Sequence, residues 1–372
     1  MNILLAAEYS TPNSGNFIAS LLELANRIRE EGGNAIFLLN KADPKRSPWI
    51  LWLERNGYCV LGLDETKPLL EQFLSIVHDY QIDIIHTHFS LCLGLLARNA
   101  REFPKTRIII HDHMGLASSG HSFKLKLQLL FLSLYYRLKG IYVVSANREK
   151  GRYYAFCRHW YVPNGLSLLR NTESNCSTQT AALNFWNETP EPGEKRCLFL
   201  GWHPQWKGLD IAIRAVDLVR KHGVDMVLCV LGFGNGMSEK NKNFIRSSTG
   251  FSPDAPFIKY MKSEEDIFAV HRSMDVYLSA SRTEAFSYGL LEAISQNVPV
   301  VVSDIPGTKW SNIYSKSFFY QVESPEQCAE ALEQAITCRN AESNASDVVE
   351  QYSVERWIDR MMEIYQNGLK CK

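Results

Sequence analysis

The sequence predicts an α/β protein built from two doubly wound domains of similar construction. Short apolar runs alternate with amphipathic stretches along the whole chain, as in a parallel sheet covered by helices on both faces. The alternation occurs twice, on either side of a polar stretch, and 372 residues suit two domains better than one. Ligands of open parallel sheets bind outside the carboxyl ends of the strands. We therefore expect a ligand site in a crevice between the two domains.

The first domain is expected to cover residues 1–166. Helical segments separate its apolar runs, which is the arrangement that parallel strands require. The strands are predicted at ILLAAE (3–8), AIFLLN (35–40), IDIIHTH (82–88), RIIIHDH (107–113) and IYVVSA (141–146).

The second domain, residues 196–350, repeats this rhythm. Between the domains, residues 167–195 are rich in Asn, Thr, Ser, Glu and Pro without a sustained period, which predicts a linker and surface loop. Strands of the second domain are predicted at CLFLGW (197–202), MVLCVLG (226–232), PFIKYM (256–261), VYLSAS (276–281) and PVVVSD (299–304).

The final segment, residues 351–372, is predicted to form a helix that returns to the first domain. Ser353 can cap this helix, and an apolar face at helical spacing needs a surface to cover. That face consists of Val354, Trp357, Ile358, Met361, Met362 and Tyr365.

Composition excludes several classes of function. Lys and Arg number 40, and so do Asp and Glu, so no bulk positive field exists to bind nucleic acid. The nine cysteines lie singly, without a C-x-x-C pair, as expected of reduced thiols in the cytoplasm. The start, MNILLAAEYS, passes directly into a strand-like run, so we expect no signal peptide. Charged residues interrupt every apolar stretch before about 18 residues, so we expect no membrane-spanning helix.

The most informative motif is RTEAFSYGLLEA, residues 282–293. Glu284 follows a predicted strand and Glu292 lies about two turns into the next helix, so both carboxylates can face one ligand. Backbone N–H groups at a helix N-terminus bind phosphate or the polar edge of a sugar. The alternative is structural: Glu292 would be a solvated helical residue and Glu284 part of a helix cap.

A second motif is GWHPQWKG, residues 201–208, between a strand and an amphipathic helix. Lys207 stands where a diphosphate would need a cation, and an ammonium group can neutralise phosphate oxygens without a metal. An ordinary surface lysine near a helix start remains the alternative. The glycine-rich turn LGFGNG (231–236) is weak evidence by itself.

In the first domain, the loop TPNSGNF (11–17) joins the first strand to a helix, and Gly15 and Asn16 could let the backbone approach phosphate. Histidines end two strands, as His86 and His88 in HTH and His111 and His113 in HDH. Imidazole is a common zinc ligand. Placing the two members of each pair on opposite faces of their strand, we do not expect a metal site. The chain also has no D-x-D pair to hold a divalent ion on a diphosphate.

The segment SFKLKLQLLFLSLYYRLKG, residues 122–140, mixes leucine and aromatic residues with basic ones. It could lie on an anionic membrane surface with its apolar face inward. A core helix with a solvated basic edge is the equal alternative. The basic residues are Lys124, Lys126, Arg137 and Lys139.

Taken in order, these segments resemble glycosyltransferase family 4, whose members have the GT-B fold of two Rossmann-like domains. The resemblance covers nearly the whole chain. It rests on the joint order of the glycine-containing loop, DIIHTH, IIIHDH, VSA, VPNG, G-x5-KG, the glycine turn, E-x7-E and PVVVSDIPG.

The resemblance implies specific roles for the residues of these motifs. Glu284 would touch the hydroxyls of the donor sugar, and Glu292 would hold the ribose hydroxyls. His111 would lie beside the reacting sugar, with His113 as the alternative, so His111 and Glu284 are the expected catalytic residues. The expected donor-binding residues are Gly15, Asn16, Lys207, Gly208, Phe286, Ser287, Tyr288, Gly289 and Glu292.

One position departs from the family pattern. The family usually has Arg after the first glycine of G-R-x4-KG, and Trp202 stands there in this chain. Lys207 could act with backbone amides alone, or Arg282 or Lys309 could supply the missing charge, or activity could be lost. We favour the first two explanations together.

The resemblance therefore implies a retaining glycosyltransferase of the hexosyltransferase type, which uses a UDP- or GDP-sugar and needs neither a metal nor another cofactor. We expect a glycan or lipid-linked acceptor. The basic amphipathic segment 122–140 further suggests a role in polysaccharide biosynthesis, with peripheral contact at the inner face of the plasma membrane. Two alternatives stay open. One is a nucleotide-sugar epimerase of the same fold, and the other is a catalytically silent binding subunit.

Overall fold

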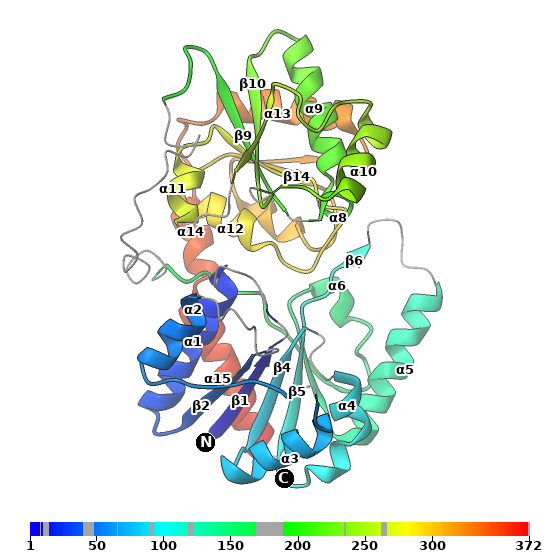
Figure 1. Cartoon of the computed structure of the whole chain (residues 1–372), viewed down its shortest axis with the longest axis vertical. Helices are drawn as coiled ribbons and strands as arrows, with labels where there is room; N and C mark the ends of the chain where they lie inside the picture. The colour runs from blue at the N-terminus through cyan, green and yellow to red at the C-terminus, as the bar shows by residue number, and fades with distance from the viewer. Residues whose placement is uncertain are drawn as a thin grey trace. The chain divides into compact units, whose positions relative to one another are not determined.

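The computed structural model describes residues 1–7, 9, 15–39, 48–64, 66–89, 93–117, 123–168, 189–201, 203–233, 236–261 and 266–370. Within it the chain forms two compact units. Unit 1 comprises Met1–Gly115, Gly120–Ser167 and Tyr352–Lys372, and unit 2 comprises Leu116–Ser119 and Leu168–Gln351. Figure 1 shows that each unit consists of a central sheet with helices on both faces.

The sheet of unit 1 has the order β3-β2-β1-β4-β5-β7-β8, and its strand pairs are parallel. The inner strands are almost wholly buried, because helices cover both faces, and this explains their uninterrupted apolar sequences. The strands are β1 (Asn2–Ala7), β2 (Asn34–Leu39), β3 (Cys59–Leu61), β4 (Ile84–His88), β5 (Arg107–Asp112), β7 (Tyr142–Ser145) and β8 (Arg158–Tyr161).

Crossover helices join these strands, as parallel pairing requires. The described helices of unit 1 are α1 (Gly15–Glu30), α2 (Pro48–Arg55), α3 (Leu69–Asp79), α4 (Leu93–Arg98), η1 (Ala100–Glu102), α5 (Phe123–Lys139), α6 (Arg148–Gly151) and α15 (Val354–Lys370).

Helix α15 comes from the end of the chain and packs on unit 1 beside α1 (Figure 1). Its entry is fixed by a parallel bridge between Leu166 and Ser353. Arg27 of α1 donates a hydrogen bond to Asp359 at 2.6 Å. The helix buries Val354, Trp357, Ile358, Met361, Met362 and Tyr365, the apolar set recognised in the sequence.

The sheet of unit 2 has the order β11-β10-β9-β12-β14-β15, again with parallel pairs. The order reverses between β9 and β12, which is where ligands bind in doubly wound sheets. The strands are β9 (Lys195–Leu200), β10 (Met226–Leu231), β11 (Ile258–Met261), β12 (Val276–Ser279), β14 (Val300–Ser303) and β15 (Ser317–Tyr320).

Two groups of helices cover this second sheet. Helix α9 (Leu209–Lys221) contacts α10 (Glu239–Thr249) and α13 (Pro325–Thr337), whereas α12 (Tyr288–Ser295) contacts α11 (Ile267–Arg272) and α14 (Ala345–Gln351). The predicted α/β architecture with two doubly wound domains is confirmed. The remaining described helices of unit 2 are α8 (Pro204–Lys207) and η4 (Lys309–Ile313).

Several local features differ from the sequence prediction. The short strands β3, β8 and β15 were not predicted. Glu284, expected in a loop, belongs to the two-residue strand β13 (Thr283–Glu284), which pairs antiparallel with β6 (Leu116–Ala117). Most of the expected linker 167–195 lies outside the described residues. Within the described ranges, no helix combines the length and apolar character needed to cross a bilayer.

Candidate functional site

Lys207 occupies a tightly constrained turn after β9. Helix α8 begins with Pro204, and the N–H of Trp206 donates to Nδ1 of His203 at 3.4 Å. A Cβ atom at Gly201 would lie only 2.7 Å from Cγ of Lys207, so glycine there leaves room for the lysine stem. Gly208 has φ of 73°, and a Cβ at that position would lie 2.0 Å from the carbonyl oxygen of Ala280. The G-x5-KG spacing thus has a steric reason in this chain.

The ammonium group of Lys207 pairs with Oε1 of Glu284. The same carboxylate oxygen accepts a hydrogen bond from the hydroxyl of Ser281 at 2.9 Å. The Lys207 side chain is 30% exposed and that of Glu284 is 12% exposed, so the cation can be reached from solvent. Because an ammonium group has three donors, Lys207 can bind an anion while it keeps its contact with Glu284.

The first turn of α12 is held closely against the strands of unit 2. Ser287 caps the helix, and its hydroxyl accepts from the N–H of Leu290 at 3.4 Å. A Cβ atom at Gly289 would lie 2.7 Å from the hydroxyl of Tyr277, so only glycine allows this approach. The positive end of the α12 dipole therefore lies beside the ends of buried strands, where an anionic ligand is favoured.

Glu292 projects from α12 into a buried environment, with its side chain 7% exposed. Its Oε2 lies 4.0 Å from Nε2 of His271, whose pKa is lowered by burial to about 3. His271 is therefore neutral at pH 7. Burial first, and then the charges of Glu284 and Glu292, raise the pKa of Tyr277. Both carboxylates thus act on one tyrosine, and the alternative of a solvated Glu292 is wrong.

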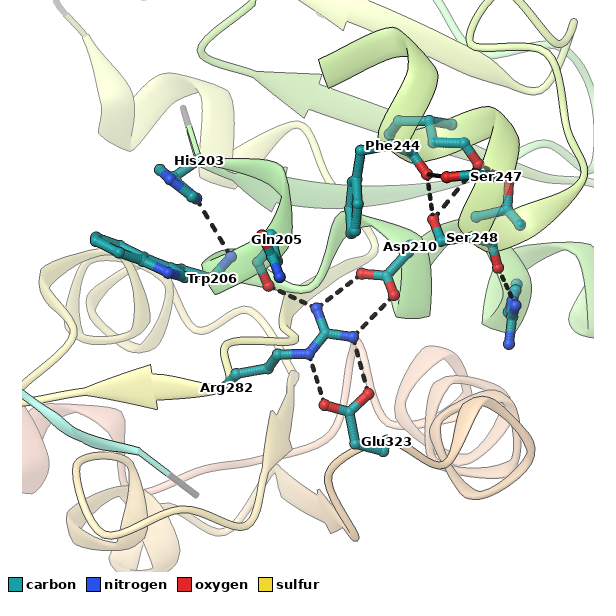
Figure 2. A network of polar contacts seen from close by, with 12 residues as sticks. His203, Gln205, Trp206, Asp210, Phe244, Ser247, Ser248, Arg282 and Glu323 are labelled. Carbon is teal, nitrogen blue, oxygen red and sulfur yellow. Dashed lines mark hydrogen bonds and ion pairs between the residues drawn. The ribbon is translucent and has the colours of Figure 1, made fainter. Parts of the chain in front are cut away.

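Arg282 cannot supply the missing diphosphate charge, contrary to one of our explanations (Figure 2). Its guanidinium group donates to both carboxylate oxygens of Asp210, at 2.9 and 2.8 Å, and to those of Glu323, at 2.5 and 2.8 Å. The hydrogen bond to Asp210 is the main cause that raises the pKa of Arg282. These contacts hold the side chain in place, so its role is structural.

Lys309, the other cation considered for the missing diphosphate charge, remains available for that role. Its ammonium group lies 3.4 Å from Oδ1 of Asp304, and the two side chains are 60% and 50% exposed. Pairs this exposed contribute little and rearrange easily. Trp202, the position that departs from the family pattern, lies outside the described residues.

The histidines of unit 1 form a cluster at the ends of β4 and β5. His88 pairs in register with His111, and the ring centroids of His86 and His88 are only 4.0 Å apart. Our placement of the two members on opposite faces was wrong, because residues two apart on a strand share a face. His111 and His113 are also stacked, with centroids 4.1 Å apart.

Burial keeps all four imidazoles neutral. It lowers the pKa of His86 to about 3 and that of His113 to about 4, and it holds those of His88 and His111 well below the usual value. His111 has no exposed surface, whereas His113 is partly exposed. Of the two candidates for contact with a substrate, His113 is therefore the one that a ligand can reach in unit 1.

Gly15 and Asn16 begin helix α1, and most of the loop before them, residues 11–14, lies outside the described ranges. Gly15 has φ of 60°, and a Cβ there would lie 2.8 Å from the hydroxyl of Tyr9. The side-chain oxygen of the buried Asn16 accepts from the N–H of Ser167 at 3.1 Å. Asn16 thus holds the chain two residues after the VPNG segment, a structural use that the sequence motif did not indicate.

Sequence reasoning missed the residues that support the site of unit 2. Ser281 holds Glu284, and Tyr277 and His271 lie against the E-x7-E segment. Ser281 and Tyr277 were within the predicted strand 276–281, and no site role was assigned to either. His271 is a lone histidine in a short helix and gave no signal.

Comparisons with known proteins relate this fold to glycosyltransferases. Residues 182–365 match the family model described as group 1 glycosyl transferases. That match and the structural neighbours support a glycosyltransferase of the GT-B fold. Membership of family 4 in particular stays a resemblance.

Among curated proteins, the O-antigen biosynthesis glycosyltransferase WclY of Escherichia coli is 23% identical over 184 residues. The match covers 48% of this chain and 47% of that protein, so it spans about half of the relative's length.

Three of the solved structures that match this chain over nearly its whole length illustrate the fold. A glycosyltransferase of Rickettsia africae has a TM-score of 0.72 at 15% identity. The match covers 100% of this chain and 99% of the Rickettsia chain. HepE of Anabaena, solved in complex with UDP and glucose, has a TM-score of 0.75 at 16% identity. The match covers 99% of this chain and 100% of the HepE chain. Sucrose-phosphate synthase of Thermosynechococcus elongatus has a TM-score of 0.71 at 15% identity, with 100% of both chains covered.

Proposed function

We propose that this protein transfers a sugar from a nucleotide diphosphate sugar, a UDP- or GDP-sugar, to a glycan or lipid-linked acceptor with retention of the anomeric configuration. The observation that carries the proposal is the pairing of Lys207 with Glu284 beside the first turn of α12. A cation, a carboxylate and a helix N-terminus there offer the three kinds of group that a diphosphate-linked sugar needs.

In the proposed complex, Lys207 and the N-terminus of α12 neutralise the diphosphate, so no metal is required for that purpose. The backbone of Phe286, Ser287, Tyr288 and Gly289 contacts the sugar and the diphosphate. Glu284 accepts hydrogen bonds from sugar hydroxyls, and Glu292 from the ribose. Gly208 acts by placing Lys207, and Gly15 by letting the backbone approach the ligand. The UDP complex of HepE supports a nucleotide donor by analogy of fold.

The difficult step is departure of the nucleoside diphosphate, and it is accelerated by groups that stabilise the charge growing on the leaving phosphate. We assign this to Lys207 and the α12 dipole. For the imidazole that contacts substrate we favour His113, with the buried His111 stacked behind it. Retention then follows from front-side displacement, in which the leaving phosphate takes the proton of the acceptor hydroxyl.

Titration calorimetry with UDP-glucose and GDP-mannose tests donor binding. We expect one of these donors, or another of a panel of UDP- and GDP-sugars, to bind the parent protein and to be hydrolysed slowly without an acceptor. Lys207→Ala should weaken binding at least about tenfold, because a charge-assisted contact is lost. Lys221→Ala is the matched control, since the Lys221 side chain is 66% exposed and forms an ion pair with Asp217. Failure of every donor to bind would reject the proposal, and product formed without an acceptor that proves to be an epimer would favour the epimerase.

A lipid-linked acceptor would lie in a membrane, and helix α5 has a surface suited to contact with one. Leu127, Phe131, Leu134 and Leu138 follow one another at helical spacing, and their exposed fractions are 41%, 64%, 41% and 74%. The opposite face is buried through Leu129 and Tyr136. A core helix would not expose this stripe, so we propose that α5 rests on an anionic membrane with its basic residues at the headgroups.

Cosedimentation with vesicles tests this contact. Vesicles of phosphatidylglycerol and phosphatidylcholine should bind the parent protein, and Phe131→Ser with Leu138→Ser should abolish binding while donor affinity stays unchanged. Neutral phosphatidylcholine vesicles should bind less, because about 1 kcal/mol per basic residue comes from anionic lipid. Equal binding of the parent and the double variant would contradict the membrane role of α5.

A further inference from the structure

The three histidines at the adjoining ends of β4 and β5 meet the geometric requirement for a shared ligand. His86, His88 and His111 each offer one nitrogen, and these nitrogens lie within 4.8 Å of one another. All three side chains have no exposed surface. The parallel register that sets His88 opposite His111 brings them together, and their rings pack at centroid distances of 4.0 to 5.4 Å.

The hydrogen bonds of these rings leave nitrogens without partners. Nδ1 of His86 is joined to the hydroxyl of Tyr365 at 2.6 Å, and Nδ1 of His88 to Nε2 of His113 at 3.0 Å. In the described part of the chain, Nε2 of His86, Nε2 of His88 and both nitrogens of His111 have no hydrogen-bond partner. Buried polar atoms are nearly always satisfied, and these four nitrogens in one cluster are available to coordinate a ligand.

We propose that His86, His88 and His111 bind one divalent transition-metal ion of the kind that prefers imidazole, with zinc as the representative. A histidine binds a metal ion through a ring nitrogen that carries no proton. A ring nitrogen held from the other side is the usual arrangement for a metal-binding histidine, and Tyr365 and His113 supply it to His86 and His88.

A metal would draw the rings closer together. Tetrahedral zinc with bonds of about 2.0–2.1 Å sets its ligand nitrogens about 3.4 Å apart, which small rotations of the side chains can provide. The nearby carboxylate of Asp112 is committed elsewhere, because it accepts from the N–H of Met114 at 2.9 Å and the hydroxyl of Tyr154 at 2.6 Å. Three neutral imidazoles thus form the protein's share of the site, and water can complete it.

A metal ion bound by the three histidines would also fix the orientation of His113. If Nε2 of His88 binds the ion, its Nδ1 carries the proton and donates to Nε2 of His113. The proposed ion lies within unit 1 and is separate from the charge that Lys207 supplies, so the inference stands or fails independently of sugar transfer.

The full chain, freed of any histidine tag and stripped with chelator, is titrated with cobalt(II) chloride. We expect one equivalent to bind, with the intense visible absorption of a tetrahedral or five-coordinate nitrogen-ligated cobalt ion, and zinc chloride should displace it. X-ray absorption of the zinc-loaded protein should show three imidazole ligands. Tyr365→Phe should weaken metal binding about 10- to 100-fold without removing it, because His86 loses the hydrogen bond that holds its ring in place as a ligand.

His88→Gln and His111→Gln should abolish the cobalt absorption. The control is His78→Gln, since His78 is 89% exposed and lies on α3, outside the cluster. Circular dichroism reports whether each variant folds. If a cluster variant does not fold, the number of imidazole ligands found by X-ray absorption of the zinc-loaded parent protein decides whether the proposal holds. No binding by the parent, fewer than three imidazole ligands, or cobalt absorption that survives in a folded His111→Gln protein would overturn the proposal.

Discussion

The backbone N–H of Arg282 donates to the carbonyl oxygen of Trp206 at 2.8 Å, which ties the segment before Glu284 to the turn that carries Lys207. The side chain of Arg282 strengthens this tie, because it also donates to the carbonyl oxygen of Gln205 at 2.5 Å while two carboxylates hold it from the sides (Figure 2). Arg282 therefore helps to position Lys207 and Glu284 through the segments that carry them.

Replacing Arg282 tests this positioning role. In Arg282→Gln, Asp210 and Glu323 lose their common partner, so we expect stability to fall by about 1–3 kcal/mol and donor affinity by about tenfold. Urea unfolding and calorimetry measure the two effects. Arg246→Gln is the control, since Arg246 is 49% exposed and pairs with Glu239 at 3.7 Å. Unchanged donor affinity in a destabilised Arg282→Gln protein would confine the arginine to stability.

Gly201→Ala tests the steric account of the G-x5-KG spacing. The added methyl group would lie 2.7 Å from Cγ and 2.9 Å from Cβ of Lys207, so the lysine must move. We expect KM for the donor to rise about tenfold, since a charge-assisted contact is misplaced, with a smaller change in the unfolding midpoint.

The control for Gly201→Ala is Gly94→Ala. No atom lies within 4 Å of a Cβ at Gly94, which is helical, so alanine should keep KM and stabilise slightly. Equal KM values for the parent and Gly201→Ala would show that the lysine stem does not need this glycine.

The histidine beside Glu292 predicts a pH dependence of stability. His271 is buried and its pKa falls from the usual 6.5 to about 3, so the unfolded chain binds this proton more readily than the folded one. The contribution of His271 is therefore complete above pH 6.5 and is lost progressively as the pH falls toward 3. In that window the parent should lose up to about 1.4 kcal/mol per pH unit more than His271→Gln. Urea unfolding at pH 7, 6, 5 and 4 measures this difference, and parallel curves for the two proteins would contradict it.

The two sheets could be predicted because their inner strands are continuous apolar runs between helical segments. The missed strands are short and lie at sheet edges: β3 has three residues, and β8 and β15 have four each. The support of the site depends on long-range contacts, since Arg282 meets Asp210 and Glu323 from 72 and 41 positions away. No local pattern reports such partners, so Arg282 was taken for a mobile cation.

The histidine cluster shows a different limit of prediction from sequence. Its residues were all identified, and the strand period of two already implies that His86 and His88 share a face. The parallel register that adds His111 is a tertiary fact, because a shift by one residue would turn that ring to the other face. Tyr365, which holds His86, comes from the last helix of the chain. The cluster therefore exists only once α15 and both strands are in place.

The attachment of α15 to unit 1 predicts that the tryptophan in its first turn is essential for stability. Trp357 is 4% exposed, and its Cβ lies so close to Gly165 that a methyl group there would be 2.7 Å away. Trp357→Ala should cost about 3–5 kcal/mol, because a large buried ring leaves a cavity. Asn367→Ala, an exposed position on the same helix, should change the unfolding free energy by less than about 0.5 kcal/mol. Thermal and urea unfolding measure both variants. A Trp357→Ala protein as stable as the parent would mean that α15 is held by its hydrogen bonds, such as that from Arg27 to Asp359, rather than by burial of its apolar face.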